Sequence, residues 1–136
     1  MFITGTFTVE LTPQRDAMKG RDGIELNRLA INKRYQGELD ATSTGEMISA
    51  VTPVKDSAGY VAIEQVTGTL NGKSGSFVLQ HSGVMDKGDQ ALQIDVVPDS
   101  GTGELEGLTG TMKIIIEEGV HHYEFNFGVK ETEGWV

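Results

Sequence analysis

Four polar residues have types and positions that could support chemistry: Glu46, Glu64, His81 and His121. Around Glu64, His81 and His121 the apolar residues alternate with polar ones, and each of these three residues shares its face of a predicted strand with apolar residues. A lone carboxylate is costly to bury unless it is hydrogen-bonded, paired or protonated. We therefore expect Glu64 to have a polar partner inside the protein.

His81 is the nearest candidate partner for Glu64. Asn71-Gly72 is a predicted hairpin turn, because both residue types tolerate the positive φ that such turns need. Counting outward from this turn places Glu64 opposite Leu79, with His81 diagonal to Glu64. A Glu-His pair can act as general base and general acid if a cavity admits a substrate. The simpler interpretation is a satisfied polar pair that closes one end of a core.

Glu46 and His121 have less defined surroundings. Glu46 lies in a segment of small residues, where missing bulk leaves either a cavity or room for a neighbouring subunit. His121 lies among aromatic residues, and its neighbour His122 points to the opposite face, so the two cannot easily bind one metal ion. The sequence has no cysteine, which excludes disulfides, thiolate zinc sites and cysteine nucleophiles. We expect no metal and no cofactor.

These residues need strands to position them, and the sequence predicts about eight. Apolar residues alternate with polar ones over most of the chain, and clusters of Gly, Asn, Asp and Ser separate the alternating segments. Short turns join most segments, which is typical of an all-β, closed antiparallel up-and-down (meander) barrel, because closure removes exposed strand edges. The predicted strands are Phe2 to Leu11, Leu26 to Tyr35, Glu38 to Ala50, Tyr60 to Leu70, Ser76 to Met85, Ala91 to Val97, Thr109 to Glu117 and Val120 to Lys130.

Three Thr-Gly-Thr triplets, centred on Gly5, Gly68 and Gly110, support this barrel. A glycine inside a strand weakens it unless a bulge, a bend or a close backbone approach requires it, and barrel corners need such bends. No glycine-rich segment leads into a helix, as a nucleotide site would require. With 136 residues and 38% hydrophobic content, we expect one barrel domain over residues 1–136.

The charge balance restricts the possible partners. Twenty acidic and 11 basic side chains give a formal net charge of −9, so the average surface repels phosphate backbones and anionic lipids. We expect neither nucleic acid nor membrane as a partner. We interpret the basic cluster from Arg28 to Arg34, which includes Lys33, as the outer face of a strand rather than an anion-binding patch. Without a recognisable secretory signal or membrane span, the expected location is the cytoplasm.

Three runs of residues, in order along the chain, carry a family resemblance: Val66 to His81 (VTGTLNGKSGSFVLQH), Val97 to Leu105 (VPDSGTGEL) and Gly119 to Phe125 (GVHHYEF). The chain resembles the bacterial family catalogued as domain of unknown function 3224. The resemblance implies a closed eight-stranded meander barrel similar to that of plant allene oxide cyclase, a homo-oligomer, and no assigned activity. It also implies that five residues match recurrent polar positions of the family, none with an established role: Glu46, Glu64, His81, Glu104 and His121.

Three functional hypotheses follow. The first is a barrel that binds a small apolar or amphipathic molecule in its interior or at its mouth, with Glu64, His81 and His121 holding the polar end. The second is an acid-base enzyme of isomerase or cyclase type that uses Glu64 and His81. The third is a structural subunit of a homo-oligomer with a filled core. A cavity at Glu64 and His81 is required by the first two hypotheses and not by the third.

Overall fold

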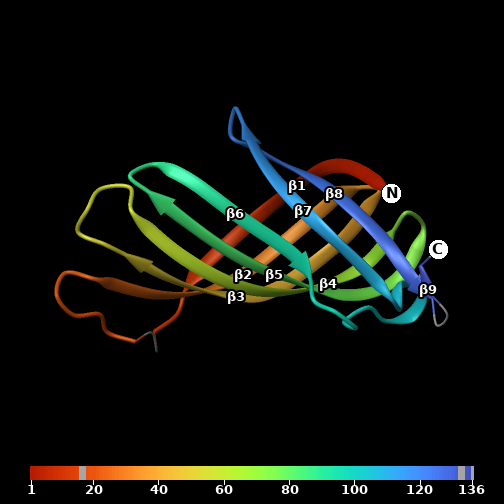
Figure 1. Ribbon diagram of the computed structural model, residues 1–136, viewed down its shortest axis with the longest axis horizontal. Helices are drawn as coiled ribbons and strands as arrows, with labels where there is room; N and C mark the ends of the chain where they lie inside the picture. Colours follow the sequence, from red (N-terminus) through yellow and green to blue (C-terminus); the bar gives the residue numbers. More distant parts are fainter. Residues whose placement is uncertain (16–17, 132–133, 136) are drawn as a thin grey trace.

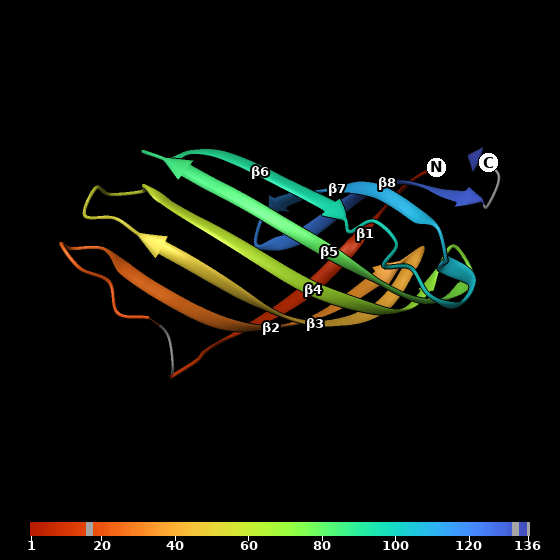
Figure 2. The same ribbon diagram turned by 60° about the horizontal axis from the view of Figure 1, so that its bottom comes forward.

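The computed structural model describes residues 1–15, 18–131 and 134–135 and shows the predicted meander barrel. Successive strands pair antiparallel in chain order, and β1 also pairs with β8, which closes the barrel (Figure 1 and Figure 2). The expected fold class is therefore confirmed. The elements are β1 (Phe2–Pro13), β2 (Glu25–Gly37), β3 (Leu39–Val51), β4 (Ala58–Leu70), β5 (Lys73–Asp86), β6 (Asp89–Val96), the 3-10 helix η1 (Gly103–Leu105), β7 (Leu108–Glu117), β8 (Val120–Glu131) and the short β9 (Gly134–Trp135).

The hairpin between β4 and β5 fixes the register of the candidate pair. Asn71 and Gly72 have φ values of 51° and 81°, as a two-residue hairpin turn with two left-handed residues requires. Glu64 pairs with Leu79 across the two strands, so the predicted register is confirmed. Most strands extend further than predicted, while β3 begins and ends one residue later and β6 ends one residue earlier. β5 begins at Lys73 rather than Ser76, because the ladder continues up to the turn.

The two ends of the barrel differ. We call the end that holds the β2–β3 turn, the β4–β5 turn and the loop 97–107 the closed end, and the end that holds the β1–β2, β3–β4, β5–β6 and β7–β8 connections the open end (Figure 2). Four aromatic side chains fill the closed end with almost no exposure to solvent: Tyr35, Phe77, Tyr123 and Phe125. The rings of Phe77 and Phe125 are stacked with their centroids 5.9 Å apart. Aromatic burial of this kind is a main stabilising contribution in small domains.

Gly5, in the first Thr-Gly-Thr triplet, is required by close packing at the closed end. A Cβ atom at Gly5 would lie 2.4 Å from the hydroxyl oxygen of Tyr123 and 2.3 Å from the carbonyl oxygen of Gln36. The Tyr123 hydroxyl itself accepts a hydrogen bond from the amide of Leu39 at 3.2 Å and donates one to the Gln36 carbonyl at 3.2 Å. The glycine therefore makes room for a buried tyrosine that ties β8 to the β2–β3 turn.

The loop 97–107 covers the edge of β5 that β6 is too short to reach. Its side-chain oxygens at Ser100, Thr102 and Glu104 accept hydrogen bonds from three alternate β5 amides, those of Val78, Ser76 and Ser74, at 3.0 Å each. The same loop contains η1, whose Leu105 is buried. Among the residues described, no helix has the length and apolar character needed to cross a membrane.

The seam between β6 and β7 is the weakest of the barrel. Only two residue pairs join the strands, Ile94 with Met112 and Asp95 with Thr111, both near the closed end. All eight residues of β6 pair with β5, and all ten residues of β7 pair with β8. The two hairpins therefore diverge towards the open end, as Figure 1 shows.

Candidate functional site

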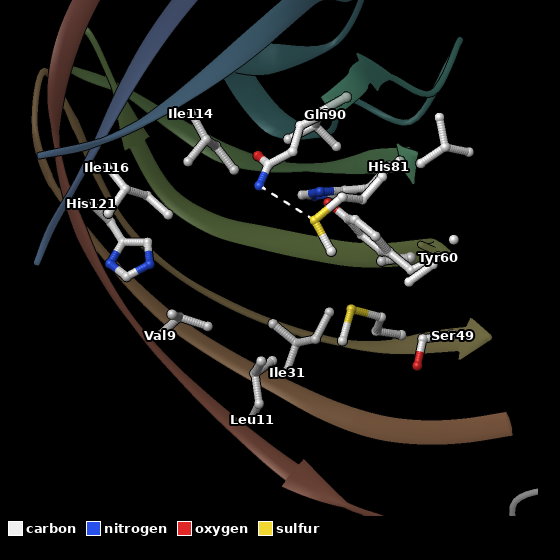
Figure 3. Close-up of a pocket in the computed structure, with 18 of the residues that line it drawn as sticks. Val9, Leu11, Ile31, Ser49, Tyr60, His81, Gln90, Ile114, Ile116 and His121 are labelled. Carbon is white, nitrogen blue, oxygen red and sulfur yellow. Dashed lines mark hydrogen bonds between the residues drawn. The ribbon is translucent and has the colours of Figure 1, made fainter. Parts of the chain in front are cut away.

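A cavity of about 410 Å³ lies at the open end of the barrel. All eight long strands contribute to its wall, and most of the lining side chains are apolar (Figure 3). The volume falls within the range of about 300–1,000 Å³ that is usual for small-molecule sites. The apolar lining includes Val9, Leu11, Ile31, Met47, Ile114 and Ile116, and the polar lining includes Lys33, Ser49, Tyr60, His81, Gln90 and His121.

Beside the cavity, a cluster of buried polar groups surrounds the carboxylate of Glu64. Glu64 has no exposed surface, and its Oε2 lies 2.8 Å from Lys33 Nζ and 2.6 Å from His81 Nε2. The Tyr35 hydroxyl donates to Oε1 at 2.5 Å. Lys33 Nζ also lies 4.9 Å from the centre of the Phe7 ring, in cation–π geometry. Three donors therefore satisfy the buried carboxylate, as its desolvation demands.

Small residues on β3 allow β2 and β4 to form this cluster. Lys33 and Tyr35 belong to β2 and Glu64 to β4, and β3 runs between them. Gly45 pairs directly with Glu64, and a Cβ atom there would lie 2.9 Å from the Glu64 Cβ and 2.0 Å from the Ile63 carbonyl oxygen. The absence of a side chain at Gly45 lets the strands approach closely enough for the β2 side chains to reach across β3.

The cluster holds Glu64 in its charged form. Burial alone would raise the pKa of the carboxyl group, but the hydrogen bond from His81 and the positive charge of Lys33 lower it from 4.5 to about 2. The pKa of Tyr35 is raised well above its usual value, by burial and by the neighbouring Glu64 charge. Tyr35 therefore remains protonated and can donate to the carboxylate.

This arrangement separates the roles of Glu64 and His81. A carboxylate with so low a pKa is a poor general base, and Glu64 is not among the residues that line the cavity. His81 does line the cavity, and Glu64 accepts a hydrogen bond from its Nε2, which leaves Nδ1 as the acceptor of a neutral ring. In the described part of the chain, His81 Nδ1 has no hydrogen-bond partner. The chemically available group is thus His81, and Glu64 orients it.

The structure places the four sequence candidates differently. Glu64 and His81 are in direct contact, as their diagonal register predicts. His121 lines the same cavity on another wall and packs against Phe7 with ring centroids 5.2 Å apart (Figure 3). Glu46 points to the outside, where its carboxylate lies 3.7 Å from Arg28 Nε. Glu46 therefore takes no part in this site.

Our interpretation of Lys33 as an outward-facing residue is wrong. Arg28 and Arg34 do lie on the outer face, but Lys33 is buried, with only 9% of its surface exposed, and forms an ion pair with Glu64. The two-residue period of a strand predicts the inward orientation of Lys33, because it puts Lys33 on the same face as Ile31 and Tyr35, which are both buried. Tyr35 was not among the sequence candidates either, and the same alternation would have identified it.

Within the described ranges, no group of three or more His, Cys, Asp or Glu side chains is placed to hold a metal ion. The fold and the site together define a small meander β-barrel with an apolar cavity beside a buried, charge-paired cluster. The chain belongs to the family described as protein of unknown function DUF3224, whose model matches residues 3–127.

A similar solved structure supports this assignment. The crystal structure of a DUF3224-family protein of unknown function from Shewanella oneidensis MR-1 is 55% identical in sequence and superposes with a TM-score of 0.95. The match covers 97% of this chain and 98% of the other. No curated protein matches the sequence. The superposition thus supports the barrel, and membership of the family assigns no activity.

Proposed function

We propose that this protein binds an apolar or amphipathic small molecule in the cavity at the open end. The observation that carries the proposal is the combination of an apolar wall with a few polar groups at one place, Lys33 and His81, whose partner Glu64 is fully buried. Such a wall supplies affinity by apolar burial, and a few polar groups fix the orientation of the ligand. His121, on the other wall, is a further polar contact for the ligand.

A dye and two tryptophan variants test this binding. Ser49 lines the cavity from β3, and Thr44 of the same strand is exposed on the outer face. We expect Nile red, a neutral apolar dye, to fluoresce on binding to the wild-type protein. Ser49→Trp fills part of the cavity and should weaken binding by about tenfold or more, which corresponds to about 1.4 kcal/mol. Thr44→Trp is the matched control and should bind as the wild type does.

Equal affinities of Ser49→Trp and wild type, or no dye binding to the wild type, would exclude the cavity as a binding site. Native mass spectrometry of protein purified gently from its own host then shows whether a ligand accompanies it. We expect the protein in the cytoplasm, so the natural ligand is to be sought among cytoplasmic metabolites.

A second candidate is an acid-base enzyme of isomerase or cyclase type. The observation that favours it is that His81 lines an open cavity while Glu64, behind it at 2.6 Å, orients its ring. His81 would take a proton from one position of the substrate and return it at another, so that no co-reactant is needed. The resemblance to an allene oxide cyclase-like barrel makes cyclisations the first reactions to screen. A His81→Ala variant that turns over a screening hit as fast as the wild type would remove this role.

We also infer that the protein forms a homo-oligomer. Four large apolar side chains are exposed on the outer face of neighbouring strands, Ile48 on β3, Val61 and Ile63 on β4, and Val84 on β5. Exposed apolar patches of this kind often mark subunit contacts. Light scattering should give a mass above the monomer for the wild type and the monomer mass for Val61→Lys. A monomeric wild type would contradict the inference.

A further inference from the structure

The apolar wall of the cavity selects an apolar ligand, and the charges beside the cavity also restrict the charge of the ligand's head group. Among the described residues, the buried Lys, Glu and His side chains are Lys33, Glu64 and His81, and the buried tyrosines Tyr35 and Tyr123, whose pKa values are raised by burial, stay neutral. The ionised Lys33–Glu64 pair, with 2.8 Å between its charged atoms, has no net charge. The site is therefore neutral when His81 is neutral and carries one positive charge when His81 is protonated. His81 decides the charge that a ligand meets.

No other titratable group near His81 changes this balance strongly. Glu64 and Tyr60 face His81 from β4, and Lys33 and Tyr35 face the same cluster from β2. Burial and the Glu64 charge raise the pKa of Tyr60, so it stays neutral. The lining residues of β1, β3, β6 and β7 are not titratable. The remaining ionisable group of the cavity is His121 on β8, which packs on Phe7.

Apart from Nδ1 of a neutral His81, the cluster offers a ligand only hydrogen-bond donors. Lys33 has only donors, and the lone pairs of Glu64 are already used by Lys33, His81 and Tyr35. A ligand anion beside a neutral site would add one uncompensated negative charge in a poorly solvated position, which is costly. Protonation of His81 removes that cost, because the imidazolium can donate from Nε2 to Glu64 and from Nδ1 to the ligand.

We propose that the cavity takes an amphipathic monoanion, of the carboxylate type, and that the His81 imidazole takes up one proton from solvent when the ligand binds. The inference rests on the proposed function and names the head group of the ligand. No covalent bond forms or breaks in this step other than the new N–H bond at Nδ1. Linkage then requires that a rise in pH weakens binding of the anion, because the bound state holds one more proton than the free state.

Titration calorimetry with decanoate and decanol, which share an apolar chain and differ in head-group charge, tests the proposal. As the pH rises, the Kd of decanoate should rise by at most about tenfold for each pH unit, and the Kd of decanol should stay constant. Measurements in two buffers of different ionisation enthalpy should show uptake of about one proton per decanoate bound. A decanoate affinity that does not change with pH would overturn the proposal.

Two histidine variants locate the proton. His81→Gln should bind decanoate more weakly, without pH dependence, and should bind decanol as the wild type does. His121→Gln removes the other histidine of the cavity and a contact of the ligand, so it should weaken decanoate binding equally at every pH and keep the wild-type pH dependence. His122→Gln is the matched control, since His122 does not line this cavity, and it should bind decanoate as the wild type does. If the dependence is lost in His121→Gln and kept in His81→Gln, the assignment to His81 is wrong. If decanol and Nile red bind and decanoate shows no proton uptake, only this inference fails. If none of the three binds, the proposed function fails as well.

Discussion

Strand edges without a partner strand occur at both ends of this barrel, and the two ends differ in what covers them. At the closed end β6 is too short to cover β5, and the loop 97–107 replaces it with side-chain oxygens from Ser100, Thr102 and Glu104. At the open end β6 and β7 separate, and no pairing joins them beyond Ile94 and Met112. One gap is sealed by hydrogen bonds, and the other is left open beside the cavity.

This difference indicates that the closed end stabilises the fold and that the open end forms the cavity. The closed end has the aromatic core and supplies the stability that folding requires. The open end lacks such filling, and its apolar residues face a cavity rather than each other. Glu64 lies where the two meet, since its neighbours towards the closed end are core residues and its partners Lys33 and His81 line the cavity. If the comparison is right, truncations at the two ends should have very different effects.

Truncation of Phe125 should have the largest effect. Phe125 has no exposed surface and stacks on Phe77, so Phe125→Ala should lower the free energy of unfolding by about 3–5 kcal/mol through lost burial and a residual void. Ile116 lines the cavity and is 63% exposed, and Ile116→Ala should change the same quantity by about 0.5 kcal/mol or less. Denaturant unfolding of both variants measures the difference. Similar losses would show that the open end is packed as tightly as the closed end.

The charge on Glu64 should make stability depend on acidity. The pKa of its carboxyl group is about 2 in the folded protein and 4.5 in the reference state, so the charged form is stabilised by folding. This contribution is present above the higher value and is lost as the pH falls from about 5 towards 2; at about 1.4 kcal/mol per pKa unit it amounts to about 3 kcal/mol.

Denaturant unfolding of the wild type and of Glu64→Gln over this acid range isolates the contribution. The amide cannot ionise, so Glu64→Gln should be less stable than the wild type at neutral pH and should lose less stability on acidification. It leaves the Lys33 charge buried without its partner, and Lys33→Met in addition should restore part of the loss. Parallel pH profiles of wild type and Glu64→Gln would mean that the carboxylate is not held ionised by the fold.

Most of the fold could be predicted from the sequence because its information is local. Alternation of apolar residues identifies each strand, and turns such as Asn71-Gly72 set the register of their hairpins. The Glu64–His81 contact follows from that register. The same alternation assigns Glu46 to the outer face, since it follows the inward-facing Gly45, and assigns Lys33 to the inner one, although its charge indicated the opposite.

The rest of the site depends on contacts between distant strands. Lys33 reaches Glu64 across an intervening strand, and that contact depends on how closely β4 approaches Gly45 of β3. The cavity depends on the separation of β6 from β7, which no local pattern encodes. Both features arise from closure of the whole barrel, so they cannot be predicted from the sequence of single segments.

The smallest effect should come from the loop that seals the closed end. Thr102 Oγ1 accepts a hydrogen bond from the Ser76 amide, and Thr102→Val keeps the shape of the side chain and removes the acceptor. Stability should fall by about 1 kcal/mol, with faster hydrogen exchange at Ser76. Thr44→Val is the control, because Thr44 is exposed on the outer face and its side chain has no hydrogen bond among the described residues.

The β7 amides of Lys113 to Ile116 that face β6 provide the internal reference for this experiment, since they have no partner strand and should already exchange fast in the wild type. Loss of the Thr102 acceptor should move the Ser76 amide towards that behaviour while amides in the β4–β5 ladder stay protected. If Ser76 exchanges as slowly in Thr102→Val as in the wild type, the loop seals the barrel through its backbone contacts, such as the 2.8 Å bond from the Thr102 amide to the Ser76 carbonyl, and the side-chain oxygens are dispensable.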